Sequence, residues 1–134
     1  MKESFMISGK RKSAIAKVRV IAGNGKVTFN GVPYQNLYFF HNLSIREPIE
    51  VFEHVMGKMP VDLIIKTSGG GSEGQIQAAR LAIAKALFKH SKSAELKKAY
   101  QLYDRNLLVA DTRRKEAYKP GDSKARAKRQ KSYR

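Results

Sequence analysis

The sequence contains no cysteine, and this absence excludes disulfide bonds, thiolate zinc sites and thiol nucleophiles. No stretch approaches the roughly 20 consecutive apolar residues that a membrane-spanning helix needs. The first residues, MKESFMISGKRKS, lack the uninterrupted apolar segment of a signal peptide. Together these absences favour a soluble protein of the reducing cytoplasm that has no membrane partner.

Acidic residues are scarce as well. Only 11 Asp and Glu stand against 27 Lys and Arg, which gives a formal net charge of +16. A compact domain with this surplus repels itself, so its partner is expected to be an anion: a nucleic acid, an anionic membrane or an acidic protein. The 134 residues suffice for one domain, and a hydrophobic content of 42% is enough for a core.

Patterns typical of catalysis are also missing. His41, His54 and His90 are isolated, without the spacing of metal ligands, and no G-x-S-x-G motif occurs. The stretch TSGGGSEGQ could place backbone N–H groups and a helix dipole against a phosphate, but it lacks the Lys-Ser or Lys-Thr of a P-loop. We interpret its Gly69–Gly71 segment as a tight turn that permits close backbone approach, including approach to RNA. The sequence therefore predicts no catalytic residue, metal, cofactor or small-molecule substrate.

Charge and apolar residues divide the chain unevenly. Residues 111–134 contain ten basic and three acidic residues, and no Leu, Ile, Val, Phe or Met follows Val109. The chain ends KARAKRQKSYR, in which more than half of the residues are Lys or Arg. Such a segment cannot form a core. We predict a globular domain over residues 1–110 and an extended basic tail over residues 111–134.

Alternation of apolar and polar residues predicts a half-buried strand over residues 14–22. Gly23-Asn24-Gly25 is typical of a hairpin turn, so we expect residues 26–29 to return beside that strand. Further strands are predicted at residues 5–7 and 61–66, and helices at residues 48–56, 72–88 and 93–103. The first helix is placed at Pro48 because proline suits a first helical turn. This order predicts an α+β fold, with one sheet covered by helices on one face.

Two helix starts carry capping signals. Ser72 and Gln75 have the spacing of a capping box, and Ser93 is expected to cap the last helix. In the second helix, apolar residues recur at helical spacing, which predicts the buried stripe Ile76, Ala79, Ile83 and Leu87. In the last helix, Leu96, Tyr100 and Tyr103 repeat at intervals of three and four residues.

A basic cluster, GKRKSAIAKVRV, precedes and enters the long strand. Within the strand, Lys17 and Arg19 share a face with Ile15 and Ile21. Such a face can lie against a phosphate backbone, with the aliphatic stems packed beneath it. The alternative is an ordinary solvated outer face, and the high net charge favours the first reading.

The aromatic stretch YQNLYFFHN allows two interpretations. Tyr34, Tyr38, Phe39 and Phe40 could form a stacking platform for single-stranded bases. Such platforms normally combine aromatic residues with cations, and residues 34–45 contain no Lys or Arg. We therefore favour core packing for these side chains.

Three stretches together resemble the universal small-subunit ribosomal protein S-nine family. GKRKSAIAKVRV with GNGKVTFNG is similar to the N-terminal hairpin of that family, and GGGSEGQIQAARLAIAKAL is similar to its signature. The end, DTRRKEAYKPGDSKARAKRQKSYR, resembles the tail of the archaeal and eukaryotic branch. The resemblance covers essentially the whole chain. Ala117-Tyr118 and Asp122 depart from the pattern, and no contact is assigned to them.

The resemblance implies a left-handed β-α-β fold like the second domain of ribosomal protein S-five. It also implies a structural role in the head of the small subunit of cytoplasmic ribosomes, beside rRNA and neighbouring head proteins. In the family, the tail extends toward the anticodon region of P-site tRNA. The residues expected to contact rRNA are Lys10, Arg11, Lys12, Lys17, Arg19, Gly69, Gly70, Gly71, Arg113, Arg114, Lys115, Lys124 and Arg126. Those expected to contact tRNA are Lys128, Arg129, Lys131, Tyr133 and Arg134.

Three other functions would also fit parts of the sequence. The chain could be a free RNA- or DNA-binding module, in which the tail only raises nonspecific affinity. An enzyme of a related fold could use the glycine turn for a nucleotide, although the missing lysine and catalytic groups argue against it. A tail that binds membrane surfaces is disfavoured, because neither an amphipathic helix nor a lipidation motif accompanies it.

Overall fold

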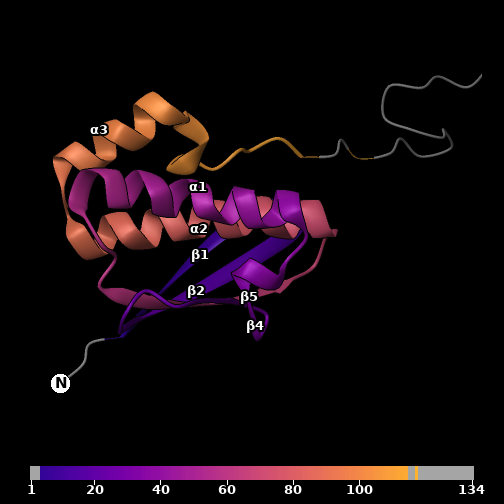
Figure 1. Cartoon of the computed structure of the whole chain (residues 1–134). Helices are drawn as coiled ribbons and strands as arrows, with labels where there is room; N and C mark the ends of the chain where they lie inside the picture. The colour runs from indigo at the N-terminus through magenta and orange to yellow at the C-terminus, as the bar shows by residue number, and fades with distance from the viewer. Residues whose placement is uncertain (1–3, 115–116, 118–134) are drawn as a thin grey trace, which may run out of the picture.

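A computed structural model describes residues 4–114 and residue 117 of the chain. Five strands form one sheet in the order β1-β2-β5-β3-β4. The elements follow one another as β1 (Phe5–Arg11), β2 (Ala14–Ala22), β3 (Val27–Phe29), β4 (Val32–Pro33), η1 (Tyr34–Asn36), α1 (Phe39–Met56), β5 (Val61–Ser68), α2 (Ser72–Ser91), α3 (Ala94–Tyr103) and η2 (Arg105–Leu107). Helices α1 and α2 lie on one face of the sheet, and α3 packs over the C-terminal half of α1 (Figure 1). The predicted α+β fold with helices on one face is confirmed.

The predicted hairpin between residues 14–22 and 26–29 is wrong. Strand β2 pairs on one side with β1 and on the other with β5, both antiparallel, whereas β3 pairs with β5 in parallel. Strand β5 therefore lies between β2 and β3, and α1 forms the crossover of a β-α-β unit. The segment that begins at Gly23 follows β2 and leads the chain past β5 to β3. There the Asp62 carboxylate of β5 accepts hydrogen bonds from the backbone N–H groups of Asn24, Gly25 and Lys26.

Helix α1 begins nine residues before the predicted start. It includes Pro48 in its interior, although proline has no N–H to donate to the carbonyl of Ser44, four residues earlier. Pro48 is buried, and its own carbonyl accepts a hydrogen bond of 2.8 Å from the hydroxyl of Tyr100 in α3. Tertiary packing therefore holds a helix through a residue that more often begins one.

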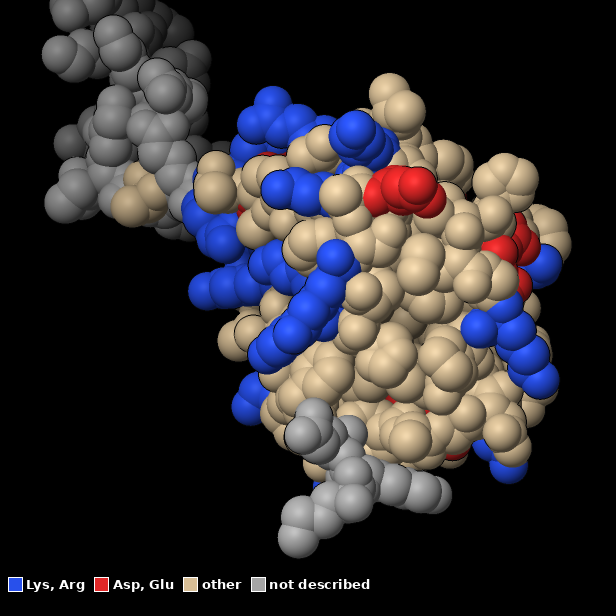
Figure 2. All heavy atoms as spheres, turned by 90° about the vertical axis from the view of Figure 1, so that its left-hand side faces the viewer, with Lys and Arg blue, Asp and Glu red and all other residues tan. Residues whose placement is uncertain are grey.

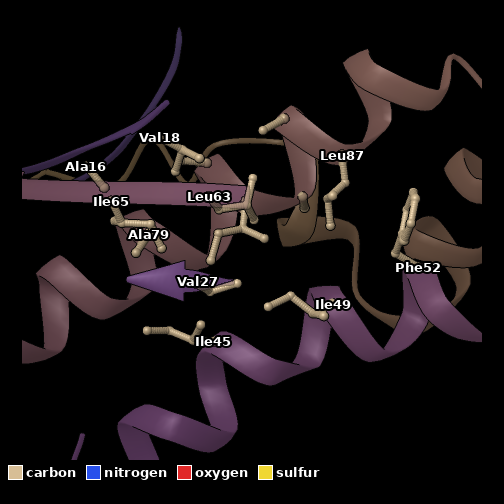
Figure 3. Close-up of a cluster of buried hydrophobic side chains, with 14 of the residues drawn as sticks. Ala16, Val18, Val27, Ile45, Ile49, Phe52, Leu63, Ile65, Ala79 and Leu87 are labelled. Carbon is tan, nitrogen blue, oxygen red and sulfur yellow. The ribbon is translucent and has the colours of Figure 1, made fainter. Parts of the chain in front are cut away.

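The core lies between the sheet and the helices. Figure 3 shows Ile45 and Ile49 of α1 beside Val27 of β3, with Phe52 farther along α1 on the side of Leu87. From α2, the predicted stripe of Ile76, Ala79, Ile83 and Leu87 is buried, as expected. A Cβ at Gly9 of β1 would come within 2.5 Å of the Ala78 carbonyl oxygen, so glycine here allows α2 to rest directly on the sheet.

The two predicted caps have different outcomes. Ser93 caps α3, because its hydroxyl accepts a hydrogen bond from the Leu96 N–H. The capping box at Ser72 is wrong, since Gly71 is the N-cap and no side chain caps α2. Gln75 instead donates to the Gly69 carbonyl at 3.0 Å and accepts from the Thr67 hydroxyl at 3.1 Å. Its side chain therefore ties the glycine turn to the end of β5.

Among the described helices, none combines the length and apolar character needed to cross a bilayer.

Candidate nucleic-acid interface

The turn between β1 and β2 presents the basic cluster predicted from the sequence. Lys10 and Arg11 end β1, and Lys12 occupies the turn with a φ of 54°. Lys10 and Lys12 are exposed, whereas Arg11 is only partly exposed and donates to the Gln77 side chain of α2 at 2.8 Å. Helix α2 thus holds the middle residue of the cluster, and its two neighbours remain available to a ligand.

Residues from the far end of the described chain join this cluster. The Asp111 carboxylate forms ion pairs with Arg11 and with Arg113, and the Nη2 of Arg113 lies 2.7 Å from its oxygen. Arg114 donates to the backbone carbonyls of Asp111 and Arg113. As a result, one surface hollow is lined by Lys10, Arg11, Lys12, Ser13, Arg113 and Arg114. We call this set of residues the basic hollow.

Asp111 holds the basic hollow together electrostatically. Hydrogen bonds from Arg113, followed by the contribution of Arg11, hold the pKa of Asp111 well below its usual range, although burial opposes them. The same carboxylate raises the pKa of Arg113. Asp111 and Arg113 therefore both stay charged at neutral pH, and the one carboxylate is shared by the guanidinium groups of Arg11 and Arg113. The five cations of the hollow keep a clear positive excess that suits a phosphate ligand.

The glycine turn, Gly69–Gly71, packs against the β1–β2 turn that carries part of the basic hollow. Gly69 and Gly70 adopt φ angles of 72° and 62°, which disfavour residues with a Cβ. A Cβ at Gly69 would lie 2.6 Å from the Ser13 carbonyl oxygen, and one at Gly70 would lie 2.9 Å from the Ala14 Cβ. The close backbone approach predicted for this turn is thus made to the β1–β2 turn of the same chain. Gly71 is exposed, and a Cβ there would meet nothing within 4 Å.

The sheet face opposite the helices forms a second basic surface. Its side chains alternate with the buried ones along β2, as predicted: Ile15, Lys17, Arg19 and Ile21 point outward. The pairing of β2 with β5 places Lys17 opposite Lys66 and Arg19 opposite Ile64. No helix of the described residues covers this surface, which we call the outer sheet face (Figure 1).

Like charges that face each other across strands destabilise a sheet. Lys17 and Lys66 form such a pair. An anion lying over the outer sheet face would reduce the repulsion between their two positive charges. The one carboxylate of β5, Asp62, is turned to the backbone at its edge, where the N–H group of Lys26 and then those of Asn24 and Gly25 lower its pKa. It therefore does little to neutralise the centre of the face.

The sequence did not identify every participant. Lys66, Gln77 and Asp111 were not among the predicted site residues. Lys66 alternates with Ile64 in a manner typical of an outward position, but its place opposite Lys17 depends on a register that only the fold provides. Asp111 lies 100 residues from Arg11, and no local pattern links them.

The predicted core packing of the aromatic stretch is wrong for three of its four residues. Tyr38, Phe39 and Phe40 are exposed by 64%, 65% and 61%, whereas Tyr34 packs against the core. The three exposed rings stand at the start of α1, where Phe40 contacts both Tyr38 and Phe39 edge to face. Beside them, His41 contacts the Glu73 carboxylate at 2.9 Å.

Charge is unevenly distributed over the rest of the surface too. On the end of the molecule at the left of Figure 1, Lys and Arg side chains gather along one side, and the middle is mostly uncharged (Figure 2). Within residues 4–114, no group of three or more His, Asp or Glu side chains could hold a metal ion. The predicted contacts of Lys115, Lys124, Arg126, Lys128, Arg129, Lys131, Tyr133 and Arg134 fall outside the described residues.

Comparison with known proteins gives a consistent result over nearly the full chain. Residues 9–134 match the protein family described as "Ribosomal protein S9/S16". The chain is 40% identical to small ribosomal subunit protein uS9 of Methanococcus vannielii, over 94% of this chain and 95% of that protein. It is 43% identical to the Thermoplasma volcanium protein of the same name, over 95% and 96% of the two chains. Identity with the Picrophilus torridus protein of that name is 40% over the whole length of both.

Proposed function

Because the chain belongs to the ribosomal protein S9/S16 family, we propose that it is a structural constituent of the small ribosomal subunit, bound to rRNA. Its archaeal relatives are structural ribosomal proteins, a class that is not enzymatic, so the chain is not an enzyme. It works in translation, in the ribosomes of the cytoplasm.

The observation that carries rRNA binding is the assembly of the basic hollow. Residues 10–12 and 113–114 lie far apart in sequence, yet they line the same hollow. The Asp111 carboxylate links the two groups through its ion pairs with Arg11 and Arg113. Arg, Lys and exposed backbone N–H groups are the usual partners of phosphate oxygens. The hollow would therefore fix the position of the protein on the RNA backbone rather than read its bases.

The outer sheet face extends this interface. Lys17, Arg19 and Lys66 stand among isoleucine side chains, and their aliphatic stems can pack on that apolar surface while the charged ends reach phosphates. The expected contacts of Gly69, Gly70 and Gly71 are secondary, since the first two already pack against the β1–β2 turn.

We also propose that residues 111–134 act as a tail that reaches P-site tRNA. Composition supports this role, because cations are separated there by small and polar residues and large aliphatic side chains are absent. An extended chain from residue 112 to the end could span up to about 80 Å, at roughly 3.3–3.6 Å per residue. Lys115, Lys124 and Arg126 would contact rRNA along the way. Lys128, Arg129, Lys131, Tyr133 and Arg134 would reach the anticodon region of the tRNA.

Binding of the full chain to a small-subunit rRNA transcript tests the role of the hollow. We expect Lys10→Gln with Lys12→Gln to reduce affinity at moderate salt roughly tenfold, about 0.7 kcal/mol for each contact. The slope of log affinity against log salt should fall by about 2, because each lost phosphate contact removes about one unit.

The matched control is Lys97→Gln with Lys98→Gln. These two lysines are exposed on α3, away from the basic hollow, and their replacement removes the same formal charge. We expect this variant to lose far less affinity. Equal losses in the two variants would mean that net charge alone drives binding, and the assignment of the hollow would then be wrong.

A further inference from the structure

A groove runs between α1 and α3 and shares none of its lining residues with the basic hollow. Its volume is about 550 Å³. It is lined by Glu47, Glu50, Val51, His54, Val55, Ala99, Leu102 and Tyr103. The five residues from α1 follow one another at intervals of three, one, three and one, so they form one face of that helix. Ala99, Leu102 and Tyr103 do the same on α3.

The groove exposes a large apolar surface. Leu102 is 89% exposed and Tyr103 is 55% exposed, while Val51 and Val55 of the facing helix are only partly buried. Single exposed apolar residues are common on proteins, but here several meet in one concave strip. A concave apolar strip between two helices is the usual receptor for an amphipathic segment.

The carboxylates of this groove have no lysine or arginine beside them in its lining. On a chain with a net charge of +16, two glutamates and no Lys or Arg line it. Glu53 is exposed one helical turn beyond Glu50. Glu47 pairs with Arg80 at 2.6 Å and Glu50 pairs with Arg46 at 2.7 Å, and both carboxylates keep partial exposure. The lining therefore offers a phosphate no cation, whereas partly exposed carboxylates can accept hydrogen bonds from a cationic polypeptide.

We propose that the groove between α1 and α3 binds an apolar segment rich in Lys or Arg that belongs to a neighbouring protein of the small ribosomal subunit. Apolar side chains of that segment would cover Leu102 and Tyr103, and its cations would meet Glu50 and Glu53. This inference goes beyond rRNA binding and concerns residues that line neither the basic hollow nor the outer sheet face. It requires only that the chain resides in the subunit.

Site-specific photocrosslinking in purified small subunits identifies the occupant directly. A benzophenone amino acid at position 102 should crosslink to a protein, and mass spectrometry should place the attachment in a segment that combines Lys or Arg with apolar residues. A crosslink to rRNA, to a second copy of this chain or to an acidic segment would overturn the proposal, as would the absence of any crosslink.

The same photoreactive residue at Met6 serves as the comparison. Met6 is 59% exposed and lies on the outer sheet face, opposite Arg19. There the crosslink is expected to reach rRNA. Failure of that reaction, with protein crosslinking at position 102 intact, would count against the rRNA interface and leave the groove proposal standing.

A pair of substitutions at one position tests the charge of the occupant. Leu102→Glu and Leu102→Lys both remove the apolar contact, and Glu and Lys have similar helix propensities. Each variant, tagged, competes with the untagged chain for incorporation into subunits, and mass spectrometry measures the ratio. We expect both to be under-represented, with the lysine variant roughly tenfold below the glutamate variant, since like charge at an interface weakens association.

The possible results are distinct. Equal losses would show that the occupant is not basic, and a greater loss for the glutamate variant would indicate RNA or an acidic partner. Normal incorporation of both would show that nothing depends on the groove. Any of these three results would overturn the proposal. The thermal unfolding midpoint of each free variant is also measured. A midpoint equal to that of the unmodified chain would verify that the fold is intact.

Discussion

At the scale of single residues, two aspartate side chains each hold a nearby segment of the chain in place. Asp62 binds the backbone N–H groups of residues 24–26, and Asp111 binds the guanidinium groups of Arg11 and Arg113. Both carboxylates have a lowered pKa for these reasons, so they remain ionised at neutral pH. Each therefore orders a segment beside a basic surface and leaves most of its cations unneutralised.

Tyr100 allows a prediction about stability. Its side chain is fully buried, and its hydroxyl donates to the Pro48 carbonyl at 2.8 Å. We expect Tyr100→Phe to lower the free energy of unfolding by about 1 kcal/mol, the usual net value of one hydrogen bond. Urea unfolding measures this change. Tyr103→Phe is the matched control, because that ring is 55% exposed, and it should leave the free energy almost unchanged.

The same hydroxyl gives this contribution a pH dependence. Burial raises the pKa of Tyr100, so the folded state favours the neutral phenol. Its contribution is complete below the unfolded pKa of about 10 and is lost as the pH rises further. The stability difference between the Tyr100→Phe variant and the unmodified chain should therefore shrink above about pH 10. A difference that stays constant through that range would contradict this account of the buried phenol.

At the scale of elements, the sequence predicted local structure better than pairing. Alternation in residues 14–22 correctly predicted the strand and the outward positions of Lys17 and Arg19. The turn residues Gly23–Gly25 fitted a hairpin, but turn chemistry does not reveal which strand will lie alongside. Strand β5, some forty residues later, occupies that place because α1 returns the chain to it in a β-α-β crossover.

Helix α1 shows the same limit. Pro48 fitted a helix start, and the preceding aromatic residues fitted a core. The helix instead extends back to Phe39, and the aromatic residues Tyr38, Phe39 and Phe40 are exposed on its first turn. Hydrophobic character alone did not distinguish a buried aromatic from one that the fold leaves on the surface.

The Lys17–Lys66 pair connects element stability with binding. Replacing Lys66 by threonine removes the repulsion across β2 and β5 and introduces a residue with higher β propensity. We expect Lys66→Thr to stabilise the free protein by about 0.5 kcal/mol and to weaken binding to the rRNA transcript several-fold. Urea unfolding and affinity measurements on the same samples test both parts.

Lys58→Thr provides the control for that substitution. Lys58 is exposed in the segment between α1 and β5 and has no lysine paired opposite to it in the sheet. Its replacement should change neither stability nor RNA affinity by a comparable amount. If Lys66→Thr destabilised the protein, or left RNA affinity intact, the outer sheet face would be an ordinary solvated surface.

At the scale of the whole molecule, the fold brings the beginning of the chain beside the start of its predicted tail. The resemblance implied rRNA contacts at residues 10–12 and at residues 113–115 without linking them, and only the fold shows that Asp111 joins Arg11 to Arg113. A contact over 100 residues leaves no periodic signal. The division into a domain of residues 1–110 and a tail of residues 111–134 stays a prediction, which truncation can test.

Truncation after Asp122 removes six of the ten cations that follow residue 110 and leaves the basic hollow complete. If body and tail have separate functions, the shortened chain should still enter small subunits in nearly normal amounts. Those subunits should bind P-site tRNA more weakly. Subunit occupancy by mass spectrometry and filter binding of tRNA measure the two effects. Poor incorporation with normal tRNA affinity in the surviving subunits would reverse the proposed division.

A comparison within the tail decides whether its end acts as a specific contact or as part of a polycation. Arg134→Ala and Lys124→Ala each remove one positive charge, so a purely electrostatic tail would respond equally to both. If the terminal residue touches tRNA, its guanidinium loses charge-assisted hydrogen bonds that are worth about 1.5–3 kcal/mol, which corresponds to a roughly 10- to 150-fold loss of affinity. Lys124 lies near the start of the truncated segment, so its replacement should reduce tRNA affinity much less. Equal losses in P-site binding would leave charge as the only property of the tail that matters.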